Sequence, residues 1–142
     1  MPRLRVVARI RTMNYLHTIH FTLEEANTLL DKYKPDIEVM VGLKKKLDLK
    51  GYDVYNHSYF GGSGPNGTGT FPPEMEKLVE IVKKVSSEGI LVKGLDNGLI
   101  DFPHIRTSGE EVYLCWQSGE REILFWHAIP DGFAGRRNIN EL

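Results

Sequence analysis

The chain of 142 residues has one cysteine, no long apolar run and almost no net charge, and each shortage excludes something. Cys115 cannot form a disulfide within the chain, and a single buried thiol is typical of the reducing cytoplasm, where we expect this protein. No apolar stretch approaches the roughly 20 residues that cross a bilayer, so we predict no membrane partner. The formal net charge of −1 provides no overall attraction for nucleic acid, which argues against nucleic acid as a partner.

The composition is that of one globular domain, which we predict to span residues 1–142. Hydrophobic residues make up 41% and charged residues 26% of the chain, close to the averages of globular proteins. Residues 4–10 place an apolar side chain at every second position, with Val7 interrupting the other face, and this period of two predicts a strand. Residues 1–13 are therefore either an extra strand or an extension of the folded unit. We interpret their arginines as charges that protect a sheet edge, with an anion-binding stripe as the alternative.

A long helix is predicted to begin after Thr22, because Thr22 and Glu25 have the spacing of a capping box. Pro35 lies inside the helix and predicts a kink or a break. The basic residues 44–46 wrap around the helix, so we expect solvated charges there rather than a nucleic-acid site. The apolar positions recur at the spacing of a seam that packs against another helix: Leu23, Ala26, Leu30, Tyr33, Ile37, Met40 and Leu47.

A glycine-rich loop is predicted over residues 51–72, and a second helix near Pro72 and Pro73. The loop lacks the lysine of a phosphate-binding P-loop and follows a helix, so we predict no nucleotide and no other cofactor. Gly89 is a natural residue to end the second helix. The apolar positions of this helix repeat the spacing of the first: Met75, Leu78, Val82 and Val85. The matched seams predict an antiparallel helical hairpin, and they could also pair between two copies to make a homodimer.

The second half of the chain has the pattern of short strands. Three Gly-containing turns, at residues 96–98, 107–109 and 118–120, separate stretches rich in β-branched and aromatic residues. The strand-like stretches are residues 90–93, 99–105, 111–117 and 122–129. Together, the two halves predict the α+β class, with an antiparallel helical hairpin packed on a three- to four-stranded antiparallel β-meander.

Several motifs together resemble a family of small prokaryotic proteins, domain of unknown function 2203. The motifs are Phe21-Thr22-Leu23-Glu24-Glu25-Ala26-Asn27, Gly98-Leu99-Ile100-Asp101-Phe102-Pro103, Leu114-Cys115-Trp116 with Gly119-Glu120, Trp126-His127, and Gly132-Phe133-Ala134-Gly135-Arg136. The resemblance covers roughly residues 21–137 and leaves the N-terminal segment outside. It implies a shared fold without a reaction, and it draws attention to Asp101, Glu120, His127 and Arg136.

The predicted hairpins determine which side chains share a face of the sheet. A turn of two or four residues after Gln117 places one set on the core face: Val112, Leu114, Trp116, Ile123, Phe125 and His127. The same parity in the preceding turn places Asp101 on that face, opposite Trp116. His127 then lies opposite Val112, about 13 Å along the strand and about 10 Å across from Asp101. A direct Asp101–His127 contact is therefore not expected without a bulge or another register.

The residues near the chain end make a better candidate site. We predict that the tail folds back so that His127 and Asp131 are catalytic, while Arg136 and Arg137 bind a small anion that Trp126 covers. Asp101 and Glu120 are added as ligand-binding candidates. We predict no metal site, because His17 and His20 lack helical spacing and no cysteine pair exists.

Two functions remain open from the sequence. The first is a ligand-binding or protein-assembly module with a small-anion pocket near His127. The alternative is a small enzyme that uses His127 as general acid–base, with Asp131 orienting it and Arg136 binding an anionic substrate. A purely structural role for His127 is also open: a histidine at the edge of the core whose ring forms a hydrogen bond with a backbone carbonyl.

Overall fold

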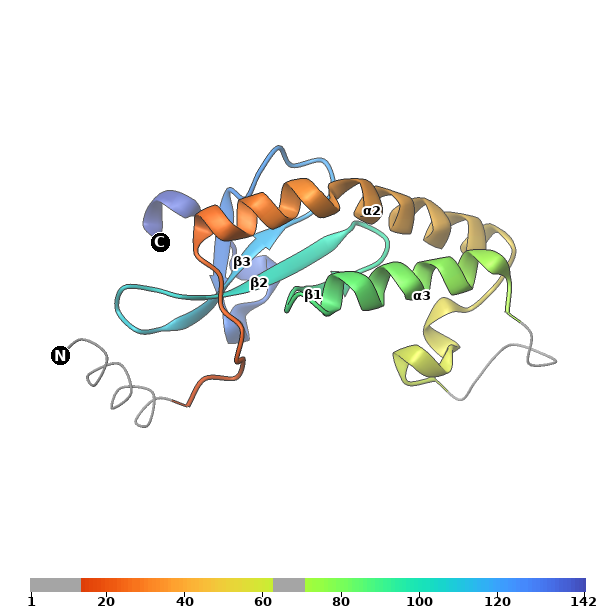
Figure 1. Ribbon diagram of the computed structural model, residues 1–142, viewed down its shortest axis with the longest axis horizontal. Helices are drawn as coiled ribbons and strands as arrows, with labels where there is room; N and C mark the ends of the chain where they lie inside the picture. The colour runs from red at the N-terminus through yellow and green to blue at the C-terminus, as the bar shows by residue number, and fades with distance from the viewer. Residues whose placement is uncertain (1–13, 63–70) are drawn as a thin grey trace.

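The computed structural model describes residues 14–62 and 71–142 (Figure 1). The predicted strand at residues 4–10 and the question of whether residues 1–13 join the fold lie outside the described residues. Residues 63–70 of the predicted glycine-rich loop also lie outside. The described parts of that loop contain two short 3₁₀ helices, η1 (Val54–Asn56) and η2 (Ser58–Phe60).

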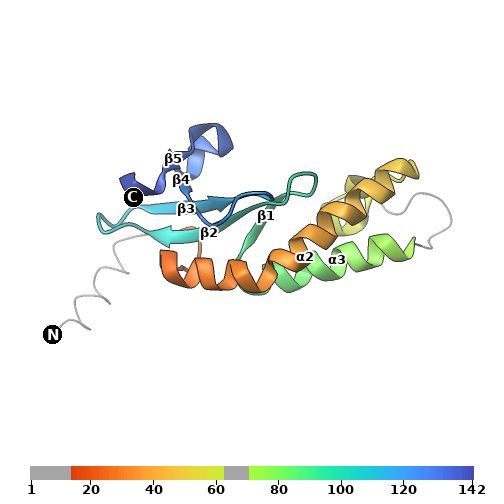
Figure 2. The same ribbon diagram turned by 90° about the horizontal axis from the view of Figure 1, so that it is seen from above.

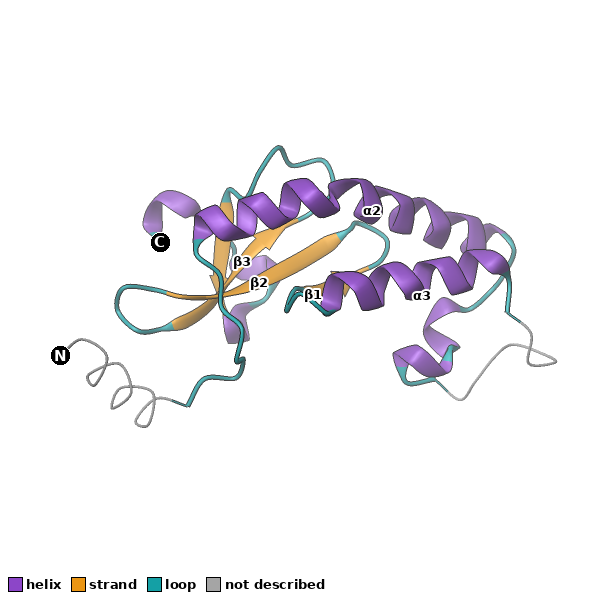
Figure 3. Cartoon of the chain, viewed as in Figure 1, coloured by secondary structure: helices purple, strands orange, loops and turns teal. Residues whose placement is uncertain are grey.

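The described residues form two α-helices and one five-stranded antiparallel sheet, which confirms the predicted α+β class. Both long helices precede the strands in sequence, and Figure 3 shows the helices packed beside the sheet. The strands follow chain order across the sheet, so the sheet is a meander with one short strand more than predicted. The elements are α2 (Leu23–Leu49), α3 (Pro73–Ser86), β1 (Leu91–Gly94), β2 (Leu99–Ile105), β3 (Glu111–Trp116), β4 (Phe125–Ala128) and β5 (Arg137–Asn138).

Helix α2 begins at the predicted capping box. The Thr22 hydroxyl accepts from the Glu25 amide at 3.1 Å, and the Glu25 carboxylate accepts from the Thr22 amide at 2.8 Å. The helix runs through Pro35 without a break, although Figure 2 shows it bending along its length. A proline removes one hydrogen bond, and the seam residues buried on both sides of Pro35 keep the two halves together.

Helices α2 and α3 pack side by side and run in opposite directions, as predicted (Figures 1 and 2). Helix α3 ends at Ser86, and Gly89, three residues later, has a φ of 96°. The seam residues are buried inside the chain, so in this arrangement they are not available to a second copy. The buried members on α2 are Ala26, Leu30, Tyr33, Ile37, Met40 and Leu47, and those on α3 are Met75, Leu78, Val82 and Val85.

One of the three lysines expected on a solvated face is buried instead. The Lys44 side chain is 7% exposed, and its amino group pairs with Asp48 at 2.6 Å and with Asp96 at 2.9 Å. Burial lowers the pKa of Lys44, but the hydrogen bonds and charges of the two aspartates outweigh this effect and the net pKa is raised. The 44–46 run therefore ties α2 to the β1–β2 turn and is not a continuous basic surface.

The sheet presents one face to the helices, and its strand register differs from the predicted one. Asp101 lies opposite Cys115 rather than Trp116, and His127 lies opposite Tyr113 rather than Val112. The β2–β3 loop contains five residues, 106–110, closed by a 2.8 Å bond from the Arg106 amide to the Glu110 carbonyl. A loop with an odd number of residues reverses the face that an even loop predicts.

The helix-facing side chains of β2 and β3 are confirmed in the core, including Val112, Leu114 and Trp116. Asp101, Phe125 and His127 were predicted on that face and are on the opposite one. We call this opposite side the outer face. It carries Asp101, Tyr113, Cys115, Phe125 and His127. In Figure 2 the helices lie on one side of β2 and β3, and the C-terminal segment around β5 lies on the other.

Candidate functional site

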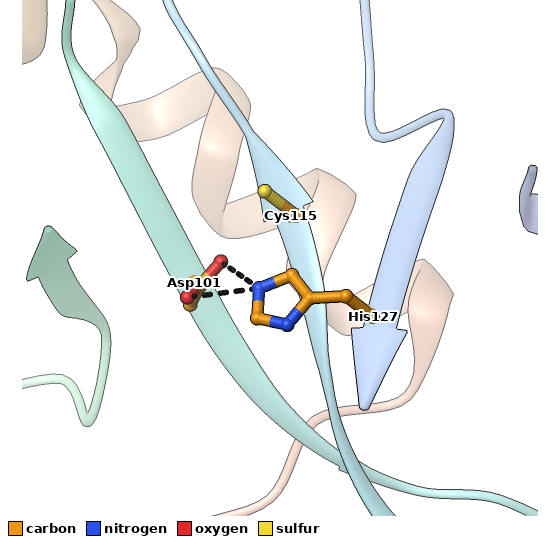
Figure 4. Close-up of side chains that lie close together, drawn as sticks. All are labelled: Asp101, Cys115 and His127. Atoms are coloured by element: carbon orange, nitrogen blue, oxygen red, sulfur yellow. Dashed lines mark hydrogen bonds and ion pairs between the residues drawn. The ribbon is translucent and has the colours of Figure 1, made fainter. Parts of the chain in front are cut away.

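Three side chains with different chemistry meet on the outer face. Asp101 comes from β2, Cys115 from β3 and His127 from β4, and Figure 4 shows the imidazole reaching across β3 toward the carboxylate. One donor atom from each residue lies within 4.8 Å of the other two. Asp101 is 2%, Cys115 0% and His127 3% exposed, so the group is shielded from bulk water. Each of the two hairpins is shifted by one residue from the predicted register, and this shift brings Asp101 and His127 together.

Both ring nitrogens of His127 have partners. Nε2 lies 3.3 and 3.4 Å from the two Asp101 oxygens, and Nδ1 lies 2.8 Å from the Ala128 carbonyl oxygen. Burial lowers the pKa of His127, but the hydrogen bonds to Asp101 and Ala128 outweigh it, and the net pKa is raised. Asp131 is exposed in η3 (Ile129–Asp131), and the partners of the His127 ring nitrogens are Asp101 and Ala128, so the orienting role of Asp131 stays a prediction.

The Cys115 thiol is not an activated nucleophile in this environment. Burial raises its pKa to about 12, and the nearby Asp101 carboxylate contributes in the same direction, while the Arg136 charge opposes them. A thiol with this pKa is protonated near neutral pH, and the thiolate is the form that attacks or binds metal. Cys115 therefore needs a bound cation to become charged.

Arg136 and Glu120 form a pair of their own beside this group. Arg136 Nη2 donates to both Glu120 oxygens, at 2.8 and 2.6 Å. The guanidinium carbon lies 4.0 Å from the ring centre of Phe125 and 4.7 Å from that of Phe133. The sequence analysis proposed both Arg136 and Glu120 as ligand-binding residues. In the structure they form a salt bridge with each other.

Trp126 and Arg137, the other predicted ligand-binding residues, do not lie with His127. Trp126 pairs with Leu114 in the register, is 1% exposed and belongs to the helix-side core. Its indole nitrogen donates to the Asn138 carbonyl at 3.2 Å, and the Arg137 guanidinium stacks on its ring at 4.9 Å. Adjacent residues of a strand point to opposite faces, so Trp126 and His127 cannot line one pocket.

Residues 14–21 form hydrogen bonds with residues on the outer face of β3. The sequence did not indicate these contacts. The His17 ring nitrogen lies 2.7 Å from the Tyr113 hydroxyl, and the Tyr113 ring meets His127 edge to face at 5.5 Å. His20 Nε2 lies 2.7 Å from a Glu111 oxygen, and Glu111 also accepts the amides of residues 16 and 17. Burial raises the pKa of Glu111, but these hydrogen bonds outweigh it and the net pKa is lowered.

A separate pocket of about 400 Å³ lies at the start of α2. Its lining residues are His20, Phe21, Glu24, Glu25, Thr28 and Leu29. One of its carboxylates, Glu25, already serves the helix cap. The pocket does not include the Asp101, Cys115 and His127 group, so the predicted anion pocket near His127 and this pocket are different places.

The fold and the buried group define a small α+β protein with a helical hairpin on one sheet face and a polar centre on the other. The chain matches the model of the family described as "Uncharacterized conserved protein (DUF2203)" over residues 20–139, and it belongs to that family. The match confirms the resemblance seen in the motifs. No curated protein and no solved structure matches the chain. Within residues 14–62 and 71–142, every helix is too short or too polar to cross a bilayer.

Proposed function

We propose that this protein is a ligand-binding module whose ligand is a transition-metal ion such as Zn²⁺, held by Asp101, Cys115 and His127. The observation that carries the proposal is the meeting of three metal-binding side chains, all buried, with donor atoms within 4.8 Å of one another. Sequence spacing predicts no metal site, because the three ligands come from three different strands. Buried ionisable groups of this kind need a partner that offsets their loss of hydration.

The separation of Asp101 and His127 supports a shared metal better than a direct hydrogen bond. Charge-assisted hydrogen bonds between nitrogen and carboxylate oxygen are about 2.7–2.9 Å long. The Nε2–oxygen distances here are 3.3 and 3.4 Å. Two ligands bound tetrahedrally at about 2.05 Å lie about 3.3 Å apart, so the spacing already fits one ion between them.

The Ala128 carbonyl provides the support that a metal-binding histidine needs. Its oxygen lies 2.8 Å from His127 Nδ1, so a proton on Nδ1 can be donated to it. That tautomer leaves a lone pair on Nε2, which faces Asp101 and Cys115. Ligand histidines commonly donate their second nitrogen to a carbonyl or carboxylate in this way, which orients the ring.

The donor types favour zinc or a similar ion over magnesium or calcium. Thiolate and imidazole are ligands for zinc, copper and iron, whereas Mg²⁺ and Ca²⁺ take oxygen ligands almost exclusively. Three protein ligands leave a fourth tetrahedral position, the composition of zinc sites that bind a water or a substrate.

The alternative of acid–base catalysis by His127 has less support. The His127 side chain is 3% exposed and its Nδ1 faces the Ala128 carbonyl, so a substrate in solution has little access to the ring for proton exchange. Self-association stays a prediction, and on this fold it has to use exposed residues such as Val39 and Leu49. A cytoplasmic location suits a site whose thiol must stay reduced to bind metal.

Titration of the metal-free full-length chain with Co²⁺ tests the proposal. We expect one ion per chain, with the near-ultraviolet absorption of a cobalt–thiolate bond and the visible spectrum of a tetrahedral centre. Cys115→Ser must remove the thiolate band, and Asp101→Asn must weaken binding. His57→Gln is the control, because His57 lies between η1 and η2 in the loop that joins α2 to α3, outside the sheet that carries the three ligands. Binding without a thiolate band, or equal binding by the Cys115 variant, would refute the site.

A further inference from the structure

Arg136 lies beside the proposed metal ligands, although its partner in the structure is Glu120. Phe125 is the residue directly opposite Cys115, and the Arg136 guanidinium stacks 4.0 Å from the Phe125 ring centre. Facing residues on neighbouring strands have their Cβ atoms about 5 Å apart. The guanidinium is thus on the same face of the sheet as Cys115 and packs against the residue that faces it.

The Arg136 side chain retains an unused hydrogen-bond donor. Its Nε atom is buried and has no hydrogen-bond partner among the described residues, whereas Nη2 is taken by Glu120. The whole side chain is 11% exposed, so water has limited access to it. A buried charged donor without an acceptor is costly, so an acceptor that binds there gains affinity from it.

We infer that the fourth position of the metal centre takes a small carboxylate, with one oxygen on the metal and the other accepting from Arg136 Nε. This inference rests on the proposed metal site. It returns to Arg136 the ligand-binding role that the sequence suggested, but with the metal rather than His127 as the second contact. A carboxylate has two oxygens that can serve two neighbouring partners at once, which a halide cannot do.

The charges of the group explain why Arg136 decides between a neutral and an anionic ligand. A divalent ion with the Asp101 carboxylate and the Cys115 thiolate is electrically neutral, so the metal alone has little net attraction for an anion. Arg136 provides the positive charge, and Glu120 competes for it through the 2.6 and 2.8 Å bonds. Neutralising Glu120 therefore has to strengthen carboxylate binding, whereas removing the guanidinium has to weaken it.

The test is a titration of the Co²⁺-loaded full chain with acetate, read from the visible spectrum of the metal, with chloride at equal ionic strength as the control anion. We expect acetate to shift the spectrum and chloride to leave it unchanged. Arg136→Gln should weaken acetate about tenfold or more, the loss expected for one charge-assisted hydrogen bond. Glu120→Gln should tighten it. Arg137→Gln is the matched control, since that neighbouring arginine stacks on Trp126 instead.

The outcomes separate the two proposals. Failure of wild-type chain to bind Co²⁺ would overturn both. Co²⁺ binding with no spectral response to acetate would overturn only the carboxylate, and the fourth ligand would then be water. An equal response in the Arg136 and Arg137 variants would also overturn it. If Arg136→Gln does not fold, the opposite change expected in Glu120→Gln still decides the matter.

Discussion

Metal binding should raise the thermal stability of this protein by an amount that can be worked out in advance. A ligand that binds only the folded state at 100 times its dissociation constant stabilises that state by about 2.7 kcal/mol. The unfolding entropy of 142 residues is about 0.3 kcal/mol/K near the transition. We therefore expect Zn²⁺, buffered at that free concentration, to raise Tm by about 9 °C.

The assay is thermal unfolding followed by circular dichroism, with and without buffered Zn²⁺, under reducing conditions. Cys115→Ser and Asp101→Asn should each lose most of the 9 °C shift, whereas His57→Gln should keep it. Equal shifts in all four proteins would mean that the ion binds elsewhere on the surface. A Tm that does not change while Zn²⁺ is bound would mean that the unfolded chain binds as well as the folded one, which contradicts a site assembled by the sheet.

Three further predictions test the fold that holds this site. Glu111→Gln should lower the free energy of unfolding, measured in urea at pH 7, by about 1–2 kcal/mol. Because the pKa of Glu111 is lowered in the folded state, the difference from wild type should be lost as the pH falls through that pKa. A difference that does not change with pH would contradict the charge-based account. Leu30→Ala, at a side chain 1% exposed, should cost about 2–5 kcal/mol, and a cost below 1 kcal/mol would contradict the buried seam. Gly98→Ala should cost more than Gly119→Ala, since both have positive φ but only at Gly98 would the added Cβ meet Ile37, at 2.9 Å; equal costs would contradict the close packing.

The helices were predictable because their signals are local. Thr22 and Glu25 are three residues apart, and the hydrogen bonds between them form within one turn of chain. The apolar seam follows from the helical repeat, and its residues, Leu30 and Ile37 among them, are buried as expected. Lys44 was an exception, because its burial depends on Asp96, which lies 52 residues away in sequence.

The site was only partly predictable, because it depends on the parity of two loops. Sequence analysis singled out both Asp101 and His127, and it also noted that a different register would bring them together. It took the hairpins to have even loops, and Gly109, with a φ of 94°, instead allows an odd one. One residue of difference moves a whole strand's side chains to the other face. The same shift brought in Cys115, which sequence reasoning treated only as a buried thiol.

The sequence by itself determined the class, the two helices with their facing seams, and the first four strands of the meander, because each depends on a period or a turn within a short stretch of chain. The tertiary structure decided which face of the sheet each strand residue occupies and which distant residues meet there. Asp101, Cys115 and His127 come together only when three strands align, and Arg136 meets Glu120 only when the tail folds back. Strand register is a long-range property, and a side-chain period of two makes it sensitive to a single residue.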